Sequence, residues 1–180
     1  MPEKTEFTLA SAAVLSYNIV GDCMATKTNA VRLVQQAGIP CREAFYDFYE
    51  QDLSGTHAAQ AIGMPAEQVF KTLVARGEKT GINVFCIPVC CELDLKKAAK
   101  AAGDKNMELV AVKELLGLTG YIRGGCSPVG RKKKYPTYFD ETCQLWEEIA
   151  VSAGARGHQM ILPPEPLAEL VGAELVDIIV

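Results

Sequence analysis

The chain has 180 residues, of which 49% are hydrophobic and 22% charged, and its formal net charge is −4. This length suits one domain with a sizeable core, and the composition excludes extended disorder. The acidic balance, with a pI near 5.3, excludes a general nucleic-acid coat, so any contact with phosphates must come from a local basic patch.

The first predicted elements follow an N-terminal extension at residues 1–25, and the domain itself covers residues 26–180. Apolar residues recur at helical spacing from Thr28 until Gly38, which predicts an amphipathic helix. A strand and its aromatic exit follow at residues 39–49. Next come a short helix at residues 54–63 and a further helical turn that begins at Pro65.

Two apolar runs in the middle of the chain predict a hairpin at the centre of a sheet. They cover residues 69–75 and 82–90, and the turn at residues 77–81 joins them. The elements after the hairpin are a helix at 94–103, a strand at 107–110, a helical turn at 112–116, strands at 137–139, 148–152 and 158–162, a helix at 164–170 and a strand at 174–179. Short turns between strands favour a mixed sheet with peripheral helices over a purely parallel one.

The segment between residues 119 and 136 combines glycine with positive charge. A predicted short strand at residues 121–122 enters Gly124-Gly125, where the backbone has no side chain to keep a ligand away. Ser127-Pro128 then fixes the backbone conformation where the chain leaves the glycine pair, because proline restricts its own φ and keeps the preceding residue extended. Four consecutive cations follow at residues 131–134. The segment is either a glycine turn before a solvated charge run or a cradle for a ligand with a phosphate tail.

Membrane, secretory and metal-binding classes are not supported. No apolar run reaches the ~20 residues of a membrane span, and Glu3 and Glu6 argue against a secretory leader. The seven cysteines include no Cys-x-x-Cys pair, and with His57 and His158 as the two histidines no zinc spacing can be assembled. We therefore predict a cytoplasmic protein with reduced thiols, no metal and no cofactor.

Lys71 is the charged residue that fits its surroundings least well. It interrupts an apolar strand, and an ammonium group is costly to bury unless an anion meets it. It either lies at the strand's start and reaches water, or it presents a fixed charge to a ligand oxygen. No serine-protease order, Gly-x-Ser-x-Gly, Walker A or Gly-x-Gly-x-x-Gly motif occurs. Cys126 has no base nearby to activate it. Such a site suits a substrate that is already reactive, such as an ester.

Four segments, in this order, resemble the YbaK-like aminoacyl-tRNA deacylases, which belong with the editing domains of prolyl-tRNA synthetases. They are residues 70–74 (FKTLV), 92–97 (ELDLKK), 119–130 (TGYIRGGCSPVG) and 151–157 (VSAGARG). The resemblance implies a single α/β (mixed α+β) domain with a mixed, partly barrel-like sheet surrounded by helices. It also implies trans-editing hydrolysis of a mischarged aminoacyl-tRNA, most typically Cys-tRNA(Pro), with Cys-tRNA(Cys) as a further substrate.

The resemblance also assigns roles to individual residues. Lys71 would be the catalytic residue. The substrate would be bound by Tyr46 (or, in the alternative register, Phe45), Thr72, Gly124, Gly125, Ser127 and Ser152. Some relatives have an acid seven residues after this serine, where this chain has Gln159.

Family and residues together predict a substrate-assisted mechanism. The cysteinyl thiol attacks its own ester carbonyl, while Lys71 and loop amides stabilise the oxyanion. Lys132, Lys133 and Lys134 would contact phosphates of the tRNA acceptor stem. The predicted partners are mischarged tRNA and, as a further candidate, prolyl-tRNA synthetase.

Three alternatives stay open at this point. The first is the same reaction on Ala-tRNA(Pro) with water as the nucleophile, because the sequence does not give the size of the pocket. The second is a tRNA-binding or small-molecule-binding module without catalysis. The third is a redox protein that uses Cys126 or the adjacent pair Cys90 and Cys91.

Overall fold

The computed structural model describes residues 27–180, so the extension predicted at residues 1–25 lies outside the described part. The strands are β1 (Arg42–Phe45), β2 (Val69–Gly77), β3 (Gly81–Pro88), β4 (Met107–Leu109), β5 (Thr137–Asp140), β6 (Ile149–Ala155), β7 (His158–Leu162) and β8 (Ala173–Val176). The helices are α1 (Asn29–Gln36), α2 (Gly55–Ile62), α3 (Leu95–Ala101), α4 (Val112–Thr119), the 3₁₀ helix η1 (Glu141–Leu145) and α5 (Pro164–Val171).

One mixed sheet of eight strands organises the fold, in the order β1-β7-β6-β2-β3-β5-β8, with β4 paired to β2. The β2–β3 hairpin is antiparallel and runs from the pair Phe70 and Pro88 to the pair Gly77 and Gly81. Strands β6 and β5 pair with it in parallel on either side. Both the central hairpin and the mixed sheet predicted from the sequence are therefore confirmed.

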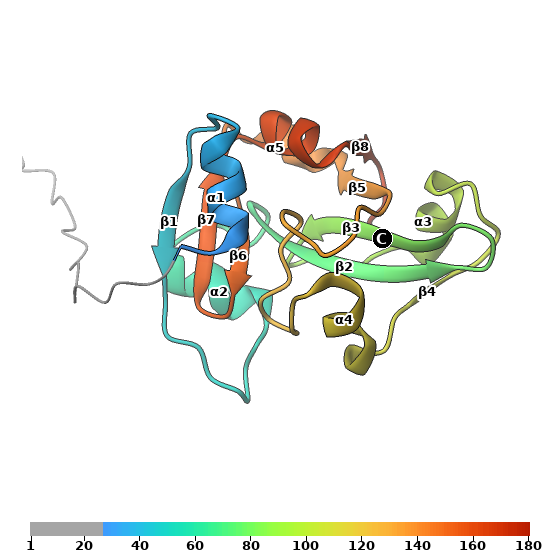
Figure 1. The fold of residues 1–180 in the computed structure, drawn as a ribbon, viewed down its shortest axis with the longest axis horizontal. Helices are drawn as coiled ribbons and strands as arrows, with labels where there is room; N and C mark the ends of the chain where they lie inside the picture. The colour runs from blue at the N-terminus through green and yellow to red at the C-terminus, as the bar shows by residue number, and fades with distance from the viewer. Residues whose placement is uncertain (1–26) are drawn as a thin grey trace, which may run out of the picture.

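The sheet is strongly bent rather than flat. In Figure 1, β1, β7 and β6 stand upright, whereas β2 and β3 run across the view. Strands β2 and β6 pair over only Val69–Ala150 and Phe70–Val151, so the two parts of the sheet diverge after this short contact. This divergence gives the sheet its partly barrel-like shape and leaves space beside the first half of β2.

The two largest apolar clusters among the described residues pack helices against the sheet. In the larger one, Val31 and Val34 of α1 and Leu167 of α5 pack with Met160 and Leu162 of β7, and all five side chains are fully buried. A second cluster joins α3 and the tail of the chain to β3 and β5. Thr28 caps α1 and connects it to the sheet, because its hydroxyl accepts from Val31 N at 3.2 Å and donates to Ala153 O of β6 at 2.6 Å.

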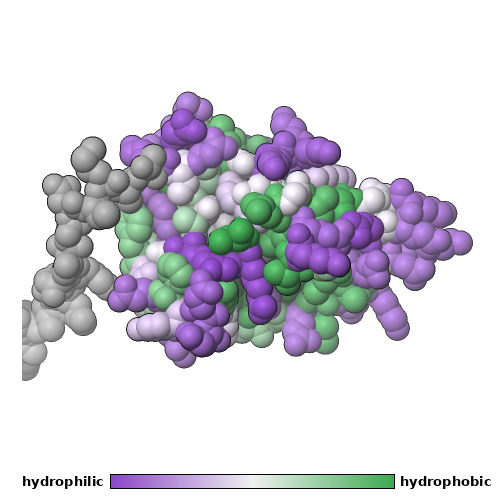
Figure 2. Space-filling model, turned by 60° about the horizontal axis from the view of Figure 1, so that its bottom comes forward, coloured by the Kyte–Doolittle hydropathy of each residue, from purple (hydrophilic) through white to green (hydrophobic). Residues whose placement is uncertain are grey.

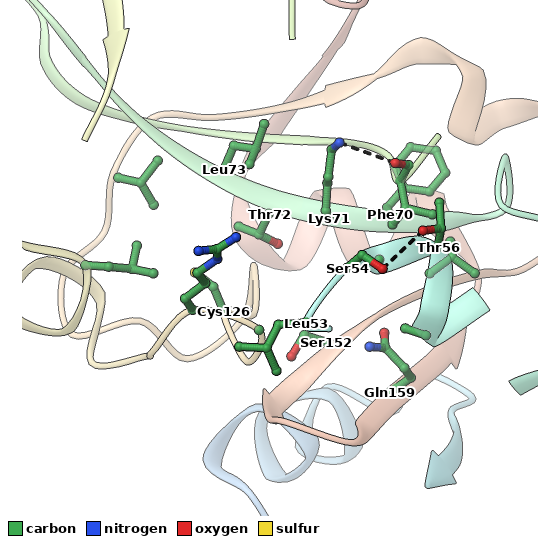
Figure 3. Close-up of a pocket in the computed structure, with 18 of the residues that line it drawn as sticks. Leu53, Ser54, Thr56, Phe70, Lys71, Thr72, Leu73, Cys126, Ser152 and Gln159 are labelled. Atoms are coloured by element: carbon green, nitrogen blue, oxygen red, sulfur yellow. Dashed lines mark hydrogen bonds between the residues drawn. The ribbon is translucent and has the colours of Figure 1, made fainter. Parts of the chain in front are cut away.

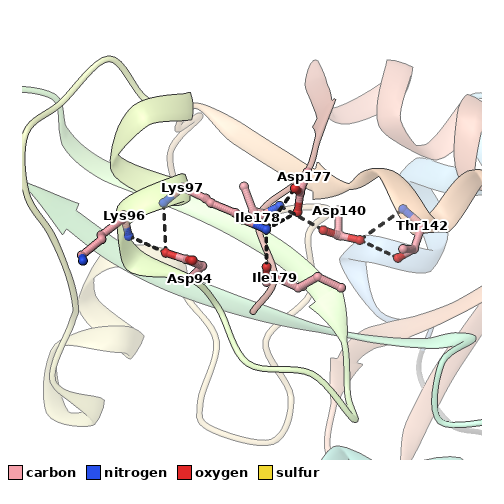
Figure 4. Close-up of polar contacts among 8 residues, drawn as sticks. All are labelled: Asp94, Lys96, Lys97, Asp140, Thr142, Asp177, Ile178 and Ile179. Atoms are coloured by element: carbon pink, nitrogen blue, oxygen red, sulfur yellow. Dashed lines mark hydrogen bonds and ion pairs between the residues drawn. The ribbon is translucent and has the colours of Figure 1, made fainter.

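The C-terminal tail is held by polar contacts (Figure 4). The fully buried Asp140 accepts a hydrogen bond from Ile178 N at 3.1 Å. Lys97 Nζ lies 2.8 Å from Asp177 Oδ1 and also 2.8 Å from Ile179 O. Asp94 caps α3, as predicted, by accepting from Lys96 N at 2.8 Å. These contacts fix the end of the chain against α3 and β5.

Some predicted elements differ from the structure. The strand predicted at residues 121–122 is wrong, because the chain turns there and Gly125 N donates to Ile122 O at 3.0 Å. Pro65 begins a single hydrogen-bonded turn, closed by Gln68 N, rather than helix. The predicted turn at residues 112–116 is longer, since α4 covers eight residues. From residue 27 onward, no helix is long and apolar enough to cross a membrane.

Candidate functional site

A cavity of about 510 Å³ lies in the space beside β2 (Figure 3). Residues 69–74 of β2 form its floor. The start of α2 and the loop before it contribute Leu53, Ser54 and Thr56, and the β6–β7 pair contributes Ser152 and Gln159. Segments from well-separated parts of the sequence therefore line one cavity, and the first half of β2 in the central hairpin is one of them.

Lys71 is one of the residues that line this cavity. Its side chain is half-buried, and its Nζ donates to Val89 O at 3.3 Å. No acidic side chain between residues 27 and 180 forms an ion pair with it. The ammonium group is thus oriented by one carbonyl oxygen and keeps donor capacity for a ligand in the cavity.

The glycine pair of the loop divides into two roles. Gly124 has φ +85° and lines the cavity, where an added Cβ would meet Leu53 at 3.3 Å and the stem of Arg156 at 3.5 Å. Gly125 is buried, and its Cβ would lie 3.1 Å from the backbone of Ala155. Gly124 therefore faces the site, whereas Gly125 lets the loop approach the β6–β7 turn closely.

Three of the predicted binding residues also line the cavity, and one lies away from it. Tyr46, Thr72 and Ser152 are in the lining. Thr72 Oγ1 lies 3.7 Å from Cys86 Sγ, and Ser152 Oγ accepts from Gly154 N at 3.2 Å. Ser127 is fully buried outside the lining, where its Oγ accepts from Val129 N at 3.2 Å and so stabilises the loop.

The aromatic residues before α2 separate clearly in space. Phe45, the alternative to Tyr46, points away from the cavity: it is 61% exposed and stacks on His158 with ring centroids 4.2 Å apart. His158 in turn lies 2.8 Å from Glu43 Oε2, so this histidine belongs to the β1–β7 edge. Of the two candidates, Tyr46 is the one that the fold places at the cavity.

Gln159 faces Ser152 across the β6–β7 pair. It is 6% exposed, and its Oε1 is buried with no hydrogen-bond donor among residues 27–180. A buried acceptor without a partner is costly, so a donor from a ligand in the cavity would stabilise it.

Lys132, Lys133 and Lys134 lie outside the cavity and are all exposed. They come seven to nine residues after Gly125 in the sequence, and the stem of Lys132 lies near Gly120 at the end of α4. Figure 2 shows hydrophobic and hydrophilic residues exposed next to each other on the side of the molecule that it views. On α4 the large exposed apolar side chains are Val112 and Leu116.

Arg123, to which no sequence motif assigned a role, is a second cation in the cavity lining and directly precedes Gly124. Its position directly before the glycine pair was the one sequence signal that could have indicated a place at the site. Within the described residues 27–180, the lining contains Lys71 and Arg123 but no aspartate, glutamate or histidine. A bound substrate therefore meets positive charge without a carboxylate or an imidazole that could take up a proton.

Burial keeps the thiols near the cavity protonated. It raises the pKa of Cys126, which lines the cavity, to about 11, and that of the fully buried Cys86 to about 12. Because the thiolate is the reactive form, both groups are poor nucleophiles at neutral pH. Cys90 and Cys91, just after β3, have their Sγ atoms 3.7 Å apart and form no disulfide.

The described residues thus combine a mixed sheet with a cavity that two cations line. The aminoacyl-tRNA editing domain family matches residues 54–170, and the chain belongs to this family. This match confirms the prediction of an aminoacyl-tRNA deacylase of the editing-domain class.

Relatives and solved structures agree with this family. The chain is 47% identical over 152 residues to an Enterococcus faecalis protein named "Putative Cys-tRNA(Pro)/Cys-tRNA(Cys) deacylase EbsC", which covers 84% of this chain and 93% of the relative. It is 30% identical over 104 residues to the proline–tRNA ligase of Shouchella clausii, over 58% of this chain and 18% of that enzyme. A crystal structure described as "a putative trans-editing enzyme for prolyl tRNA synthetase" matches with a TM-score of 0.71 at 29% identity, over 85% of this chain and 98% of the other.

Proposed function

We propose that this protein removes cysteine from mischarged tRNA(Pro), with the substrate's own thiol as the nucleophile. The observation that carries this proposal is the composition of the cavity, which among residues 27–180 contains two cations and neither a carboxylate nor an imidazole, the usual general bases. Deacylation by water needs a base to accept a proton in the transition state, whereas a thiol ionises more readily than water and is favoured by nearby positive charge. The named activity of the Enterococcus relative supports the same substrate.

The reaction balances without an enzyme nucleophile. The cysteinyl thiol loses its proton to solvent, and its sulfur forms a bond to the ester carbonyl carbon. The bond between that carbon and the ribose oxygen then breaks, and the ribose oxygen takes up a proton. The products are cysteine thiolactone and free tRNA, and water later opens the thiolactone. An intramolecular nucleophile supplies a high effective concentration, so the protein's task is to orient the ester and stabilise its oxyanion.

Lys71 and Gly124 are the groups that we assign to the oxyanion. Lys71 Nζ is held by a single carbonyl at 3.3 Å and has further donor capacity. Gly125 N–H is used by Ile122 O, so the glycine at the cavity, Gly124, supplies the loop amide. The unpaired Oε1 of Gln159 would accept a hydrogen bond from the substrate's ammonium or hydroxyl groups.

The tRNA would lie across the exposed lysines that follow the glycine loop, Lys132, Lys133 and Lys134. Phosphate contacts from flexible lysines give affinity that depends on salt and not on sequence. Prolyl-tRNA synthetase is the second partner in this proposal. Its support is the similarity of this chain to a segment of a proline–tRNA ligase and to the solved trans-editing structure.

The decisive experiment compares three charged forms of one tRNA(Pro): Cys-tRNA, Ala-tRNA and S-methylcysteinyl-tRNA. We expect release of cysteine at least ~10²-fold faster than release of the other two, because only the free thiol gains the effective molarity of an intramolecular attack. Mass spectrometry of the quenched reaction should detect the thiolactone.

Two outcomes would contradict the mechanism. Equal rates for cysteine and alanine would assign the reaction to a water nucleophile, and tight binding of all three without turnover would indicate a non-catalytic module.

A further inference from the structure

Three loops meet beside the cavity, and glycines make this junction possible. They are residues 46–54 before α2, the glycine loop at 121–125, and the β6–β7 turn at 154–157. Tyr46 N donates to Gly157 O at 2.9 Å, and a Cβ on Gly157 would come within 2.5 Å of Tyr46 O. Gly125 also approaches the β6–β7 turn closely. The loop before α2 and the glycine loop, which form two walls of the cavity, therefore both contact this turn.

Arg156 lies at the centre of this junction and holds both walls. Its Nε donates to Arg123 O in the glycine loop at 2.9 Å, and its Nη1 lies 3.0 Å from Glu50 Oε1 in the loop before α2. Its aliphatic stem lies 3.5 Å from the place that a Cβ on Gly124 would take. The arginine side chain is 21% exposed, whereas Glu50 is 78% exposed.

We propose that Arg156 is a positioning residue for deacylation, one that acts through the glycine loop. Because it holds the carbonyl of Arg123, it fixes the orientation of the peptide group that joins Arg123 to Gly124. It thereby fixes the loop amide and the second cation of the cavity. This inference rests on the proposed function, in which Gly124 and the cavity cations face the reacting ester.

The two contacts of Arg156 are unequal, and this difference makes the role testable. The ion pair with Glu50 is exposed, and exposed ion pairs contribute little. The contact with Arg123 O joins a mostly buried charge to a backbone carbonyl, and such charge-assisted bonds are stronger. Loss of the Glu50 contact should therefore lower the rate of deacylation much less than loss of the Arg156 side chain.

The kinetic test uses purified full-length protein and Cys-tRNA(Pro). For Arg156→Ala we expect kcat to fall about 10- to 100-fold with KM changed less than about threefold, because small displacements of positioning groups cost about this much. Glu50→Gln should lower kcat less than about threefold. The matched control is Arg42→Ala, which removes an arginine with an ion pair to Glu148 at the far end of β1 and should keep wild-type kinetics.

Hydrogen exchange on the free protein provides the readout that does not depend on activity. In Arg156→Ala, amides at residues 121–126 should exchange at least about tenfold faster, while the β2–β3 hairpin keeps its wild-type protection. Unchanged exchange in this loop, or a kcat within threefold of wild type, would overturn the proposal. Faster exchange throughout the chain would overturn it too, because it would show a general loss of stability. If wild-type protein fails to deacylate Cys-tRNA(Pro), the proposed function fails, whereas the exchange result still decides whether Arg156 holds the loop.

Discussion

Replacement of Lys71 by methionine tests the proposed chemistry most directly. Methionine keeps the apolar stem of this half-buried side chain and removes its charge, whose observed contact is one carbonyl at 3.3 Å. An ammonium about 4 Å from a developing oxyanion contributes about 4 kcal/mol at an effective dielectric constant near 20. Since Arg123 shares the cavity and retains part of this stabilisation, we expect kcat to fall about 10²- to 10³-fold.

The assay is single-turnover deacylation of Cys-tRNA(Pro), with thermal unfolding followed in parallel. The folded protein should keep its melting temperature, because removing a partly desolvated charge without an acidic partner costs no ion pair. The control is Lys100→Met in the last turn of α3, which removes an exposed lysine and should leave the rate unchanged. A rate for Lys71→Met within tenfold of wild type, with the fold intact, would refute the oxyanion role.

Three further predictions concern other parts of the protein. Replacing the three exposed lysines at residues 132–134 by glutamine should weaken tRNA binding and reduce the magnitude of the slope of log K against log[salt] by about 2 to 3. Filter binding at several salt concentrations measures this slope. An unchanged slope would show that the tRNA phosphates bind elsewhere. Cys126→Ala should lower kcat less than about tenfold, because the raised pKa of the Cys126 thiol disfavours a nucleophilic thiolate. Loss of a catalytic nucleophile would instead lower kcat by several orders of magnitude. Hydrogen bonds from the N–H groups of Thr80 and its neighbours lower the pKa of Asp104, so its stabilising effect is present above the unfolded pKa of about 3.9 and is lost as the pH falls below that value. Urea denaturation of Asp104→Asn should accordingly show a lower midpoint than wild type at pH 6, with a difference that shrinks in acid; a difference that is constant with pH would contradict this assignment.

The central hairpin and the capped helices could be predicted from local patterns, because burial and capping follow directly from residue type and spacing. Asp94, for example, caps α3 where the sequence places the first turn. The strand at residues 121–122 could not be excluded in this way. Tyr121 and Ile122 have the β-propensity of a strand, but Tyr121 instead donates its hydroxyl to Val129 O at 2.6 Å and so belongs to the loop.

The candidate site was partly accessible to sequence reasoning. Lys71 attracted attention as a charge inside an apolar strand, and that argument needed no knowledge of the fold. Arg123 has no such local conflict, because an arginine in a glycine-rich loop suits an exposed turn equally well. The role of Ser127 was equally hidden, since a serine before proline suits both a binding loop and a buried turn. Only the tertiary arrangement separates these cases.

The position of the β2–β3 hairpin between β6 and β5 also has a consequence for the order of events during synthesis. The hairpin is complete at Pro88, and β4, which begins at Met107, pairs only with the last three residues of β2. The strands that flank the rest of the hairpin begin at Thr137 and Ile149. A nascent chain therefore carries an apolar hairpin with the edge of β3 and the first half of β2 unpaired while the ribosome adds roughly 50 to 60 more residues, which takes several seconds at ordinary elongation rates. Such edges invite pairing with other chains. We expect the emerging protein to depend on chaperones until its last strands leave the exit tunnel.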